Sequence, residues 1–303
     1  MKAVAILLST YNGERFLREQ IDSILRQTYA HIKLYIHDDG STDATKSIIY
    51  EYGKLFPNQV VIIDEKKHFG YPDCFWYLLR KCPASDYYAF CDQDDVWDKT
   101  KIDVAVKRMN SQNNESPVLY IHDYENCSAD LSIISTHRLE KFLPLTERNI
   151  LFFTVASGFS MIINNKLRDM LNAEQLMKHG VFHDEWCIWT AFFNGTVLYE
   201  DCVMAKYRRH SSAYTTYGNS AKTLLYSWIF DEVLGDDFSK KCDRIRYFLC
   251  KDGCITESAK KEWKFLARRR GEPGYLKRLF FPHRLRPSLS GEIALRILFL
   301  LNA

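Results

Sequence analysis

The segment Tyr87-Tyr88-Ala89-Phe90-Cys91-Asp92-Gln93-Asp94-Asp95-Val96-Trp97 is an apolar run that ends in three carboxylates within four residues. Tyrosine, phenylalanine and cysteine suit a buried strand, and a helical pattern begins at Asp98. The carboxylates are therefore expected at the carboxyl end of a strand. In open α/β sheets, ligands bind at that end.

Carboxylates this close together repel one another unless a hard cation lies between them or backbone N–H groups bind them. One interpretation is a divalent ion, Mg²⁺ or Mn²⁺, held between aspartate oxygens and a substrate phosphate. The alternative is that Asp94, Asp95 and Asp98 cap the next helix, because aspartate is a common capping residue.

Strands and helices alternate through the first half of the chain, which predicts a doubly wound, mostly parallel α/β sheet. We expect strands over 4–8, 33–37, 60–64, 87–91 and 118–123, with helices over 14–27, 43–56, 73–81 and 98–109 between them. After residue 126 the alternation loosens. We expect strands over 157–163, 196–199 and 203–207, with an aromatic-rich helix over 183–193.

This pattern suggests a domain over 1–215, with a donor half over 1–125 and an acceptor half over 126–215. A helical, basic extension is expected over 216–303. Residues 260–303 carry a net charge of +8, whereas residues 1–259 carry −5. The nine cysteines show no CxxC pair, which favours a reducing compartment.

A second acidic turn, Asp38-Asp39, ends another predicted strand, so both turns can border one crevice. A nucleoside diphosphate requires one acid that accepts hydrogen bonds from base or ribose and another that holds the metal. Asp39 suits the first task and Asp94 the second. The chain has neither a G-x-G-x-x-G fingerprint after the first strand nor a P-loop, so a metal is expected to hold the phosphates.

Six motifs occur in the order and spacing of family-2 inverting glycosyltransferases with the GT-A fold. They are Ser9-Thr10-Tyr11-Asn12, Asp38-Asp39-Gly40-Ser41-Thr42-Asp43, Asp92-Gln93-Asp94-Asp95-x-Trp97, Gly158, His183-Asp184-x-Trp186 and Tyr207-Arg208-x-His210. The chain also resembles rhamnosyltransferase-type enzymes of bacterial cell-surface polysaccharide synthesis. The resemblance covers about residues 1–215 and implies a GT-A-type, Rossmann-like sheet.

The resemblance implies single-displacement transfer from a nucleotide-diphospho-sugar. It assigns Asp39 to the pyrimidine, Asp92 to ribose or donor sugar, Asp94 to the metal and Asp184 to the acceptor-side base. Ser9, Thr10, Tyr11 and Gln93 are matched to the donor site in the same way. Two departures concern sugar selectivity: His68-Phe69-Gly70 replaces a frequent Asn-x-Gly, and Arg208-Arg209-His210-Ser211 replaces a frequent Arg-x-His-Gly.

Inverting transfer requires one carboxylate that deprotonates the acceptor hydroxyl, and a metal can stabilise the leaving group in place of an acid. Asp184 is the candidate for that base, with Glu185 in reserve. Nearby Phe182, Trp186 and Trp189 would raise its pKa by desolvation. The alternative is that Asp184 is the N-cap of the helix that follows.

His210 follows a predicted strand and lies beside two arginines. It is a candidate metal ligand or diphosphate contact, and Arg208 would add positive charge for the diphosphate. The alternative is a basic surface loop. His183 is expected to be a structural neighbour of Asp184.

The tail mixes basic residues with aromatic and aliphatic ones, for example at Lys277-Arg278-Leu279-Phe280-Phe281 and over 293–301. Such a mixture suits an anionic membrane interface. The alternatives are a helical layer on the catalytic domain and a homodimer interface. Nucleic acid is disfavoured because the body of the chain is acidic. No window has the ~20 apolar residues of a spanning helix, and the N-terminus is interpreted as a strand.

The sequence thus predicts a metal-dependent glycosyltransferase at the cytoplasmic face of the membrane. Its donor would be a dTDP or UDP sugar, with rhamnose or a related hexose, and its acceptor a lipid-linked saccharide or polysaccharide. Two other readings are a metal-dependent nucleotidyltransferase or phosphatase, and a non-catalytic module that binds sugar nucleotides or membranes.

Overall fold

A computed structural model describes residues 1–63, 67–112, 115–147, 149–210, 233–251, 255–268, 272 and 274–301. The chain forms two compact units. Unit 1 comprises Met1–Glu140 and Ala156–His210, and unit 2 comprises Lys141–Val155 and Ser211–Ala303. The boundary expected at residue 215 lies outside the described residues. Residues 141–155 belong with the C-terminal helices rather than with the sheet.

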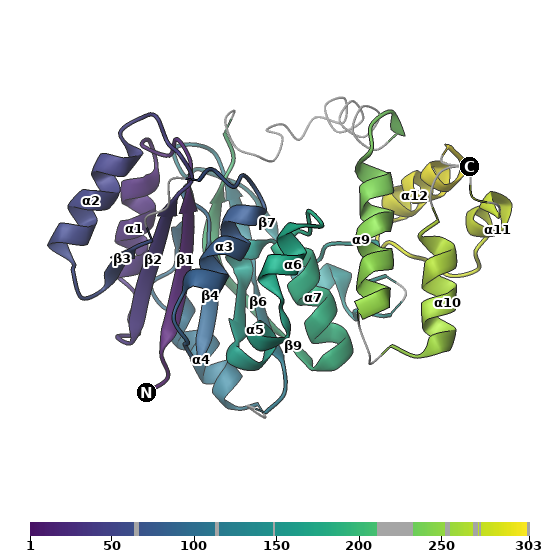
Figure 1. Cartoon of the computed structure of the whole chain (residues 1–303), viewed down its shortest axis with the longest axis horizontal. Helices are drawn as coiled ribbons and strands as arrows, with labels where there is room; N and C mark the ends of the chain where they lie inside the picture. Colours follow the sequence, from purple (N-terminus) through teal and green to yellow (C-terminus); the bar gives the residue numbers. More distant parts are fainter. Residues whose placement is uncertain are drawn as a thin grey trace. The chain divides into compact units, whose positions relative to one another are not determined.

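Unit 1 is built on one nine-stranded sheet with the order β3-β2-β1-β4-β8-β6-β9-β5, and β7 pairs with β6 (Figure 1). The strands are β1 Val4–Thr10, β2 Ile32–Asp38, β3 Val60–Ile62, β4 Tyr87–Cys91, β5 Val96–Trp97, β6 Val118–Cys127, β7 Ile133–His137, β8 Met161–Asn164 and β9 Thr196–Arg208. The sheet is mixed and mostly parallel, as the sequence predicts.

Strand β1 lies between β2 and β4 and is parallel to both. Its residues Val4–Leu8 are almost completely buried, which explains the continuous apolar run in the sequence. Because parallel strands end at the same edge, the segments after β1, β2 and β4 meet there. These segments carry the predicted donor-site residues.

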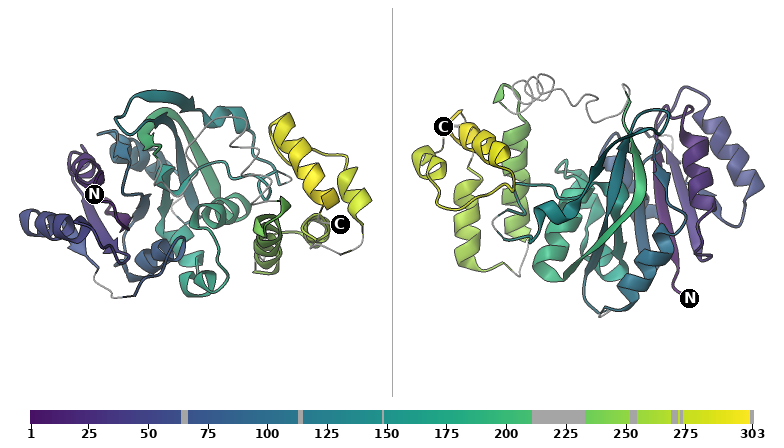
Figure 2. Two further views of the ribbon diagram at one scale, coloured as in Figure 1. Left: turned by 90° about the horizontal axis from the view of Figure 1, so that it is seen from above. Right: turned by 180° about the vertical axis from the view of Figure 1, so that it is seen from behind.

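Helices flank the sheet, in the arrangement that Figures 1 and 2 show. They are α1 Leu17–Leu25, α2 Thr45–Leu55, α3 Asp73–Lys81, α4 Lys101–Asn110, α5 Asn165–Met170, α6 Ala173–Met177 and α7 His183–Asn194. Helix α3 begins and ends at the predicted residues. Each of the four predicted βα segments of the donor half is present, with ends that differ by a few residues.

Some elements differ from the sequence prediction. The short strands β5 and β7 and the helices α5 and α6 were not expected. The two strands expected over 196–207 are one strand, β9, whose pairing with β6 shifts register after His122 and again after Asp123. A 3₁₀ turn, η2 Gly158–Ser160, replaces the first part of the strand expected over 157–163.

Unit 2 contains the helices α9 Asp237–Lys251, α10 Glu257–Leu266, α11 Tyr275–Leu279 and α12 Leu289–Leu301. Their buried side chains include Phe238, Trp263 and Phe299, and Phe152 packs against the last two. This segment around Phe152 explains why residues 141–155 group with the helices. The helical character expected for the tail is therefore confirmed for these residues.

Within the described residues, every helix is too short or too polar to cross a membrane. The eight cysteines in the same part of the chain are all free thiols.

Candidate active site

The ends of β1 and β2 are joined by hydrogen bonds between their loops. Thr10, which is 1% exposed, donates its hydroxyl to Asp38 Oδ1 at 3.2 Å. Asp38 also accepts from the backbone N–H of Ser41 at 3.0 Å. The Ser9 hydroxyl contacts the thiol of Cys74. In this arrangement Ser9 and Thr10 stabilise the rim of the site through neighbouring protein groups.

Asp39 is buried beside this rim, and its carboxylate accepts hydrogen bonds from the backbone N–H groups of Phe69 at 2.6 Å and Gly70 at 2.7 Å. The imidazole of His37 lies 3.4 Å from Oδ1 and that of His68 lies 3.1 Å from Oδ2. Burial alone would raise the pKa of Asp39, but these donors lower it below its usual value. Asp39 is therefore an ionised acceptor held in a fixed orientation.

The side chain of Gln93 binds the main chain of Tyr11 in both directions. The Tyr11 N–H donates to Gln93 Oε1 at 2.9 Å, and Gln93 Nε2 donates to the Tyr11 carbonyl at 3.0 Å. The Tyr11 ring is half exposed, and its centroid lies 5.3 Å from that of His68. Gln93 thus positions the loop after β1, while Tyr11 and His68 offer aromatic faces near Asp39.

The turn after β4 contains three aspartates in different environments. Asp92 and Asp94 are partly buried, whereas Asp95 is fully buried. Within the described residues, the Asp92 carboxylate accepts no hydrogen bond. Burial, together with the negative charges of Asp94 and Asp184, raises the pKa of Asp92 to about 7. Burial, Asp94 and Asp92 likewise raise the pKa of Asp95 well above its usual value.

Arg208, at the end of β9, is 2% exposed and binds this turn from the protein side. Its backbone N–H donates to Asp95 Oδ1 at 3.2 Å and its Nε donates to the Asp94 carbonyl at 2.8 Å. The remaining guanidinium nitrogens bind Glu19 Oε2, at 2.5 Å, and the carbonyl of Ala129. Arg208 therefore holds the acidic turn through its backbone N–H and Nε, and its other guanidinium nitrogens bind Ala129 and Glu19.

His210 lies at the same turn and is 8% exposed. Its Nε2 is 2.8 Å from Asp94 Oδ2, and its ring packs on Phe16 with 4.7 Å between the centroids. The alternative of a basic surface loop is wrong for Arg208 and His210, because both are buried against the turn. Ser211, the last residue of that sequence motif, lies outside the described residues.

Asp184 is the second residue of α7, whose N-cap is Phe182. Its Oδ1 accepts a hydrogen bond from the N–H of Glu185 at 2.7 Å. The N-cap alternative for Asp184 is therefore wrong. Because its charge raises the pKa of Asp92, Asp184 lies within electrostatic reach of the acidic turn. Glu185 is buried, at 6% exposure.

His183 supports the start of α7 from the interior. Its ring centroid lies 4.4 Å from that of Phe75 and 4.6 Å from that of Phe90. A Cβ on Gly158 would lie 2.1 Å from His183 Nε2, so only glycine allows this close approach. Burial lowers the pKa of His183 to about 3, so the imidazole is neutral. The expectation of a structural neighbour agrees with this environment.

The carboxylates of the acidic turn fit a metal ion that is bound partly by the protein and partly by a substrate. In the described part of the chain, no group of three or more His, Cys, Asp or Glu side chains is arranged to hold a metal by itself. Asp92 and Asp94 nevertheless offer oxygen ligands, and the repulsion that raises the pKa of Asp92 favours a cation. Mg²⁺ is often bound by one or two carboxylates together with substrate phosphates.

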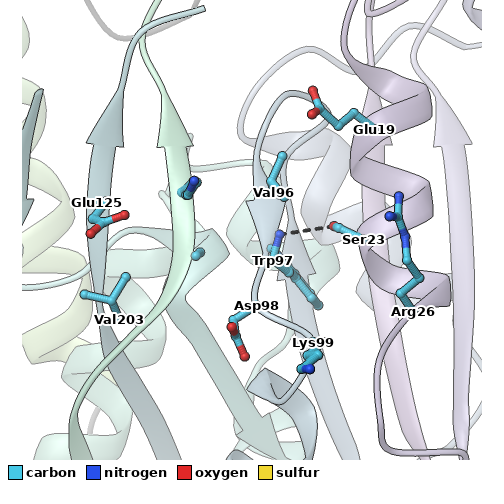
Figure 3. Close-up of a pocket in the computed structure, with 11 residues that line it drawn as sticks. Glu19, Ser23, Arg26, Val96, Trp97, Asp98, Lys99, Glu125 and Val203 are labelled. Atoms are coloured by element: carbon cyan, nitrogen blue, oxygen red, sulfur yellow. Dashed lines mark hydrogen bonds between the residues drawn. The ribbon is translucent and has the colours of Figure 1, made fainter. Parts of the chain in front are cut away.

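A pocket of about 730 Å³ is lined by residues of α1, β5, β6 and β9 (Figure 3). Its lining includes Glu19, Val96, Trp97, Glu125 and Lys206. None of the predicted site residues lines it. It touches the acidic turn only indirectly, because Glu19 binds Arg208 and Val96 follows Asp95 in the chain. This pocket is therefore distinct from the candidate active site.

Sequence reasoning missed several residues of the site. His37 and the Phe69-Gly70 backbone bind Asp39, Glu19 binds Arg208, and the fully buried Lys101 lies behind the acidic turn. The partners of Asp39 and Arg208 are far apart in the sequence. Lys101 stands in the sequence like an ordinary lysine of a surface helix, so no local signal marks it as buried.

Comparison with known proteins identifies the family of the chain. Residues 5–171 match the model of Glycosyl transferase family 2. The chain is 38% identical to the dTDP-rhamnosyl transferase RfbG of Shigella flexneri over 102 residues, which are 33% of this chain and 35% of that protein. It is 24% identical to an uncharacterised glycosyltransferase of Rickettsia felis over 82% of this chain and 41% of that protein. The chain thus spans well under half of these two relatives.

A third relative matches over most of its length. The chain is 23% identical to the Escherichia coli glucosyltransferase WfgD, covering 81% of this chain and 90% of that protein. Among solved structures, S. aureus TarS 1–349 matches with a TM-score of 0.60 and 14% identity over 86% of this chain and 69% of that one. The mannosyltransferase PcManGT of Pyrobaculum calidifontis matches with a TM-score of 0.54 and 16% identity, over 97% of this chain and 74% of that one.

These structural matches confirm the GT-A-like arrangement of a mostly parallel sheet with flanking helices. The family match covers more than half of the chain and includes both acidic turns and Gly158. The chain therefore belongs to glycosyl transferase family 2.

Proposed function

We propose that this protein transfers a sugar from a nucleoside diphosphate donor to an acceptor hydroxyl with inversion at the anomeric carbon. One observation carries the proposal: residues 5–171 match glycosyl transferase family 2. The charges of Asp184 of α7 and Asp94 of the acidic turn, which both act on Asp92, support it. A candidate base and a candidate metal-binding turn therefore border the same site. The catalytic region would be residues 1–215, as a donor half and an acceptor half.

In this proposal, Asp184 accepts the proton of the acceptor hydroxyl as that oxygen attacks the anomeric carbon. The position at the start of α7 suits this role, because the Glu185 N–H binds Asp184 Oδ1 and so helps to orient the carboxylate. Asp94 and His210 would hold Mn²⁺ or Mg²⁺, and Asp92 would bind the ribose or the donor sugar. When bound, the metal would stabilise the negative charge of the leaving diphosphate. Arg208 would act indirectly, by holding the carbonyl of Asp94.

The donor is proposed to be a dTDP or UDP sugar, with rhamnose or a related hexose. Asp39 would accept a hydrogen bond from the pyrimidine, and its lowered pKa keeps it ionised for that task. Tyr11 and His68 would offer stacking faces to the base. Two similar proteins agree with this choice of donor. RfbG is a dTDP-rhamnosyl transferase, and TarS was solved with UDP-GlcNAc.

The acceptor is proposed to be a lipid-linked saccharide or a polysaccharide of the bacterial cell surface. WfgD, which matches over most of its length, is described as acting on a GlcNAc-diphosphoundecaprenol. An acceptor of this kind would bring the protein to the cytoplasmic face of the membrane. The basic C-terminal helices are a candidate surface for that contact.

The test separates the proposed base from its neighbour. In Asp184→Asn, transfer should fall by roughly the 10²–10⁴-fold typical of a lost general base, because the amide cannot take the proton. Donor affinity should hardly change, since the amide keeps the size and shape of the carboxylate. Transfer would be measured with nucleotide sugars and a lipid-linked acceptor, and donor affinity by calorimetry.

Glu185→Gln is the matched control and should be much milder. If Glu185→Gln abolished transfer and Asp184→Asn retained it, Glu185 would be the base. The same samples test the other functions: release of nucleotide without sugar transfer would favour a phosphatase or nucleotidyltransferase. Binding without any turnover in the wild type would favour a non-catalytic module.

A further inference from the structure

Lys101, the first residue of α4, is a lysine with no exposed surface. Its Nζ donates one hydrogen bond, to the carbonyl of Phe159 at 2.6 Å, and lies 3.4 Å from the centroid of the Trp97 ring. Within the described residues it forms no direct ion pair. A buried cation is costly unless other charges or π-systems compensate it. Its surroundings should therefore contain the compensating groups.

Those groups belong to the acidic turn. Burial lowers the pKa of Lys101 to about 7, while Asp95 and Asp92 act to raise it. In return, Lys101 acts to lower the pKa of both carboxyl groups. Asp95 is also fully buried, and its Oδ2 has no hydrogen-bond partner in the described residues. Lys101 and Asp95 are thus two fully buried groups of opposite type, and each favours the charged form of the other.

Lys101 also contacts two segments of the site: Trp97, which follows the acidic turn, and Phe159 of η2. Trp97 belongs to β5, directly after the turn. Its backbone N–H donates to Ser23 Oγ at 3.1 Å (Figure 3). Phe159 belongs to the turn η2, where Gly158 packs against His183. His183 precedes Asp184 in α7. One buried side chain therefore contacts both the strand that follows the metal-binding turn and the backbone that supports the proposed base.

We propose that Lys101 is a positioning residue that fixes the Asp92–Asp95 turn relative to η2 through Trp97 and Phe159, with its amine as the buried counter-group of the carboxylates of the turn. The inference rests on the proposed function, since it assigns the turn to a metal and α7 to the base. Without Lys101, the buried carboxylates would lose their counter-group, and the turn would bind a cation in a less ordered arrangement.

The experiment measures Mn²⁺ binding and transfer separately. Lys101→Met keeps the length and apolar stem of the side chain but removes the charge. Bound Mn²⁺ would be counted from the loss of its free-ion electron paramagnetic resonance signal, with and without UDP or dTDP. We expect Mn²⁺ affinity to fall about tenfold, within the range of interaction energies between neighbouring groups. The kcat for transfer should fall more than the donor KM rises.

Lys107→Met is the matched control on the same helix, because Lys107 is exposed and pairs with Asp103, four residues before it. It should bind Mn²⁺ like the wild type. A double-mutant cycle with Asp95→Asn tests the charge relation: Lys101→Met with Asp95→Asn should bind Mn²⁺ better than Lys101→Met alone. The double variant also covers a failure of the single variant to fold, since it should restore soluble protein.

The inference is overturned if Lys101→Met binds Mn²⁺ and transfers sugar like the wild type, or if the double variant restores neither folding nor Mn²⁺ binding. A fall in thermal stability with unchanged Mn²⁺ affinity and unchanged kcat would mean a packing role only. A wild-type protein that binds no Mn²⁺ would instead contradict the proposed metal site, so the two failures are distinguishable.

Discussion

At the scale of single residues, Asp94 is a proposed metal ligand that is also bonded to buried protein groups. One oxygen is 2.8 Å from His210 Nε2, and its carbonyl accepts from Arg208. Asp94→Asn should therefore keep the fold but lower Mn²⁺-dependent nucleotide affinity at least about tenfold, because the amide is a weaker metal ligand. Nucleotide titration with and without Mn²⁺ measures this. Unchanged affinity in the presence of Mn²⁺ would exclude Asp94 as a ligand.

His183 gives a residue-scale prediction about pH. Its folded pKa of about 3 lies below the ordinary histidine value, so the unfolded state binds the proton more readily. Its stabilising effect is complete above the ordinary pKa and is lost as pH falls toward the folded pKa. Between pH 7.5 and 5 this one group should cost about 2 kcal/mol of unfolding free energy. Thermal midpoints of the wild type and His183→Leu would be compared at both values.

The variant should lose less stability on acidification than the wild type. His31→Gln is the control, because His31 is exposed. Equal losses in the wild type and His183→Leu would mean that His183 accepts a proton in the folded protein.

At the scale of elements, the contact between η2 and α7 has a specific requirement at Gly158. In Gly158→Ala, the new methyl group would displace the His183 ring, since it would lie 2.1 Å from Nε2. Overpacking of this kind typically costs about 1–3 kcal/mol. We expect a lower thermal midpoint together with weaker transfer, because Asp184 follows His183. Combining Gly158→Ala with His183→Ser should recover part of both losses, and strict additivity would argue against a direct contact.

Element boundaries also show what the sequence could predict. Buried apolar runs such as Val4–Leu8 and the amphipathic pattern of α3 depend on local composition, and these elements were predicted correctly. Strand β7 was missed because its Ile133 and Ile134 are exposed and its partner is a distant strand. Strand β5 has two residues and exists only through pairing with β9. Such elements depend on contacts that no local window contains.

The residues of the candidate site also divide into those that a local sequence pattern predicts and those that depend on distant contacts. Asp39, Asp92, Asp94 and Asp184 are recognisable because carboxylates at strand and helix ends form a pattern in the sequence. The partners of these residues are not recognisable in this way. Arg208 was assigned to the diphosphate from its charge alone, whereas the fold places its guanidinium among Glu19, Ala129 and Asp94. Whether a charged side chain faces a ligand or the interior depends on the packing around it.

At the scale of the whole molecule, the C-terminal unit offers an apolar helix face. In α12, Leu295, Leu298 and Phe299 are buried, whereas Leu289, Ile293 and Ile297 are 68%, 52% and 38% exposed. These three residues are spaced by four, so they lie along one side of the helix. Phe280, just after α11, is 77% exposed. We propose this face, in a segment of net charge +8, as a contact surface for an anionic membrane.

Ile293→Asp with Ile297→Asp should therefore reduce co-sedimentation with anionic vesicles at low salt, without changing nucleotide affinity. Met170→Asp is the control, because Met170 is an exposed apolar residue of unit 1. If the wild type does not bind vesicles, the membrane proposal fails. A halved mass of the double variant in light scattering would then identify the face as a homodimer interface.

The pairing of Gln93 with the Tyr11 backbone bears on any attempt to re-engineer donor preference. A Cβ on Gly13 would lie 2.2 Å from Gln93 Oε1, and Gln93→Glu would direct a carboxylate at the Tyr11 carbonyl. Combinatorial libraries should therefore keep Gln93 and Gly13 constant, although both lie beside the proposed donor site. The side chains of Tyr11 and His68 are largely exposed and can be randomised at little cost to folding.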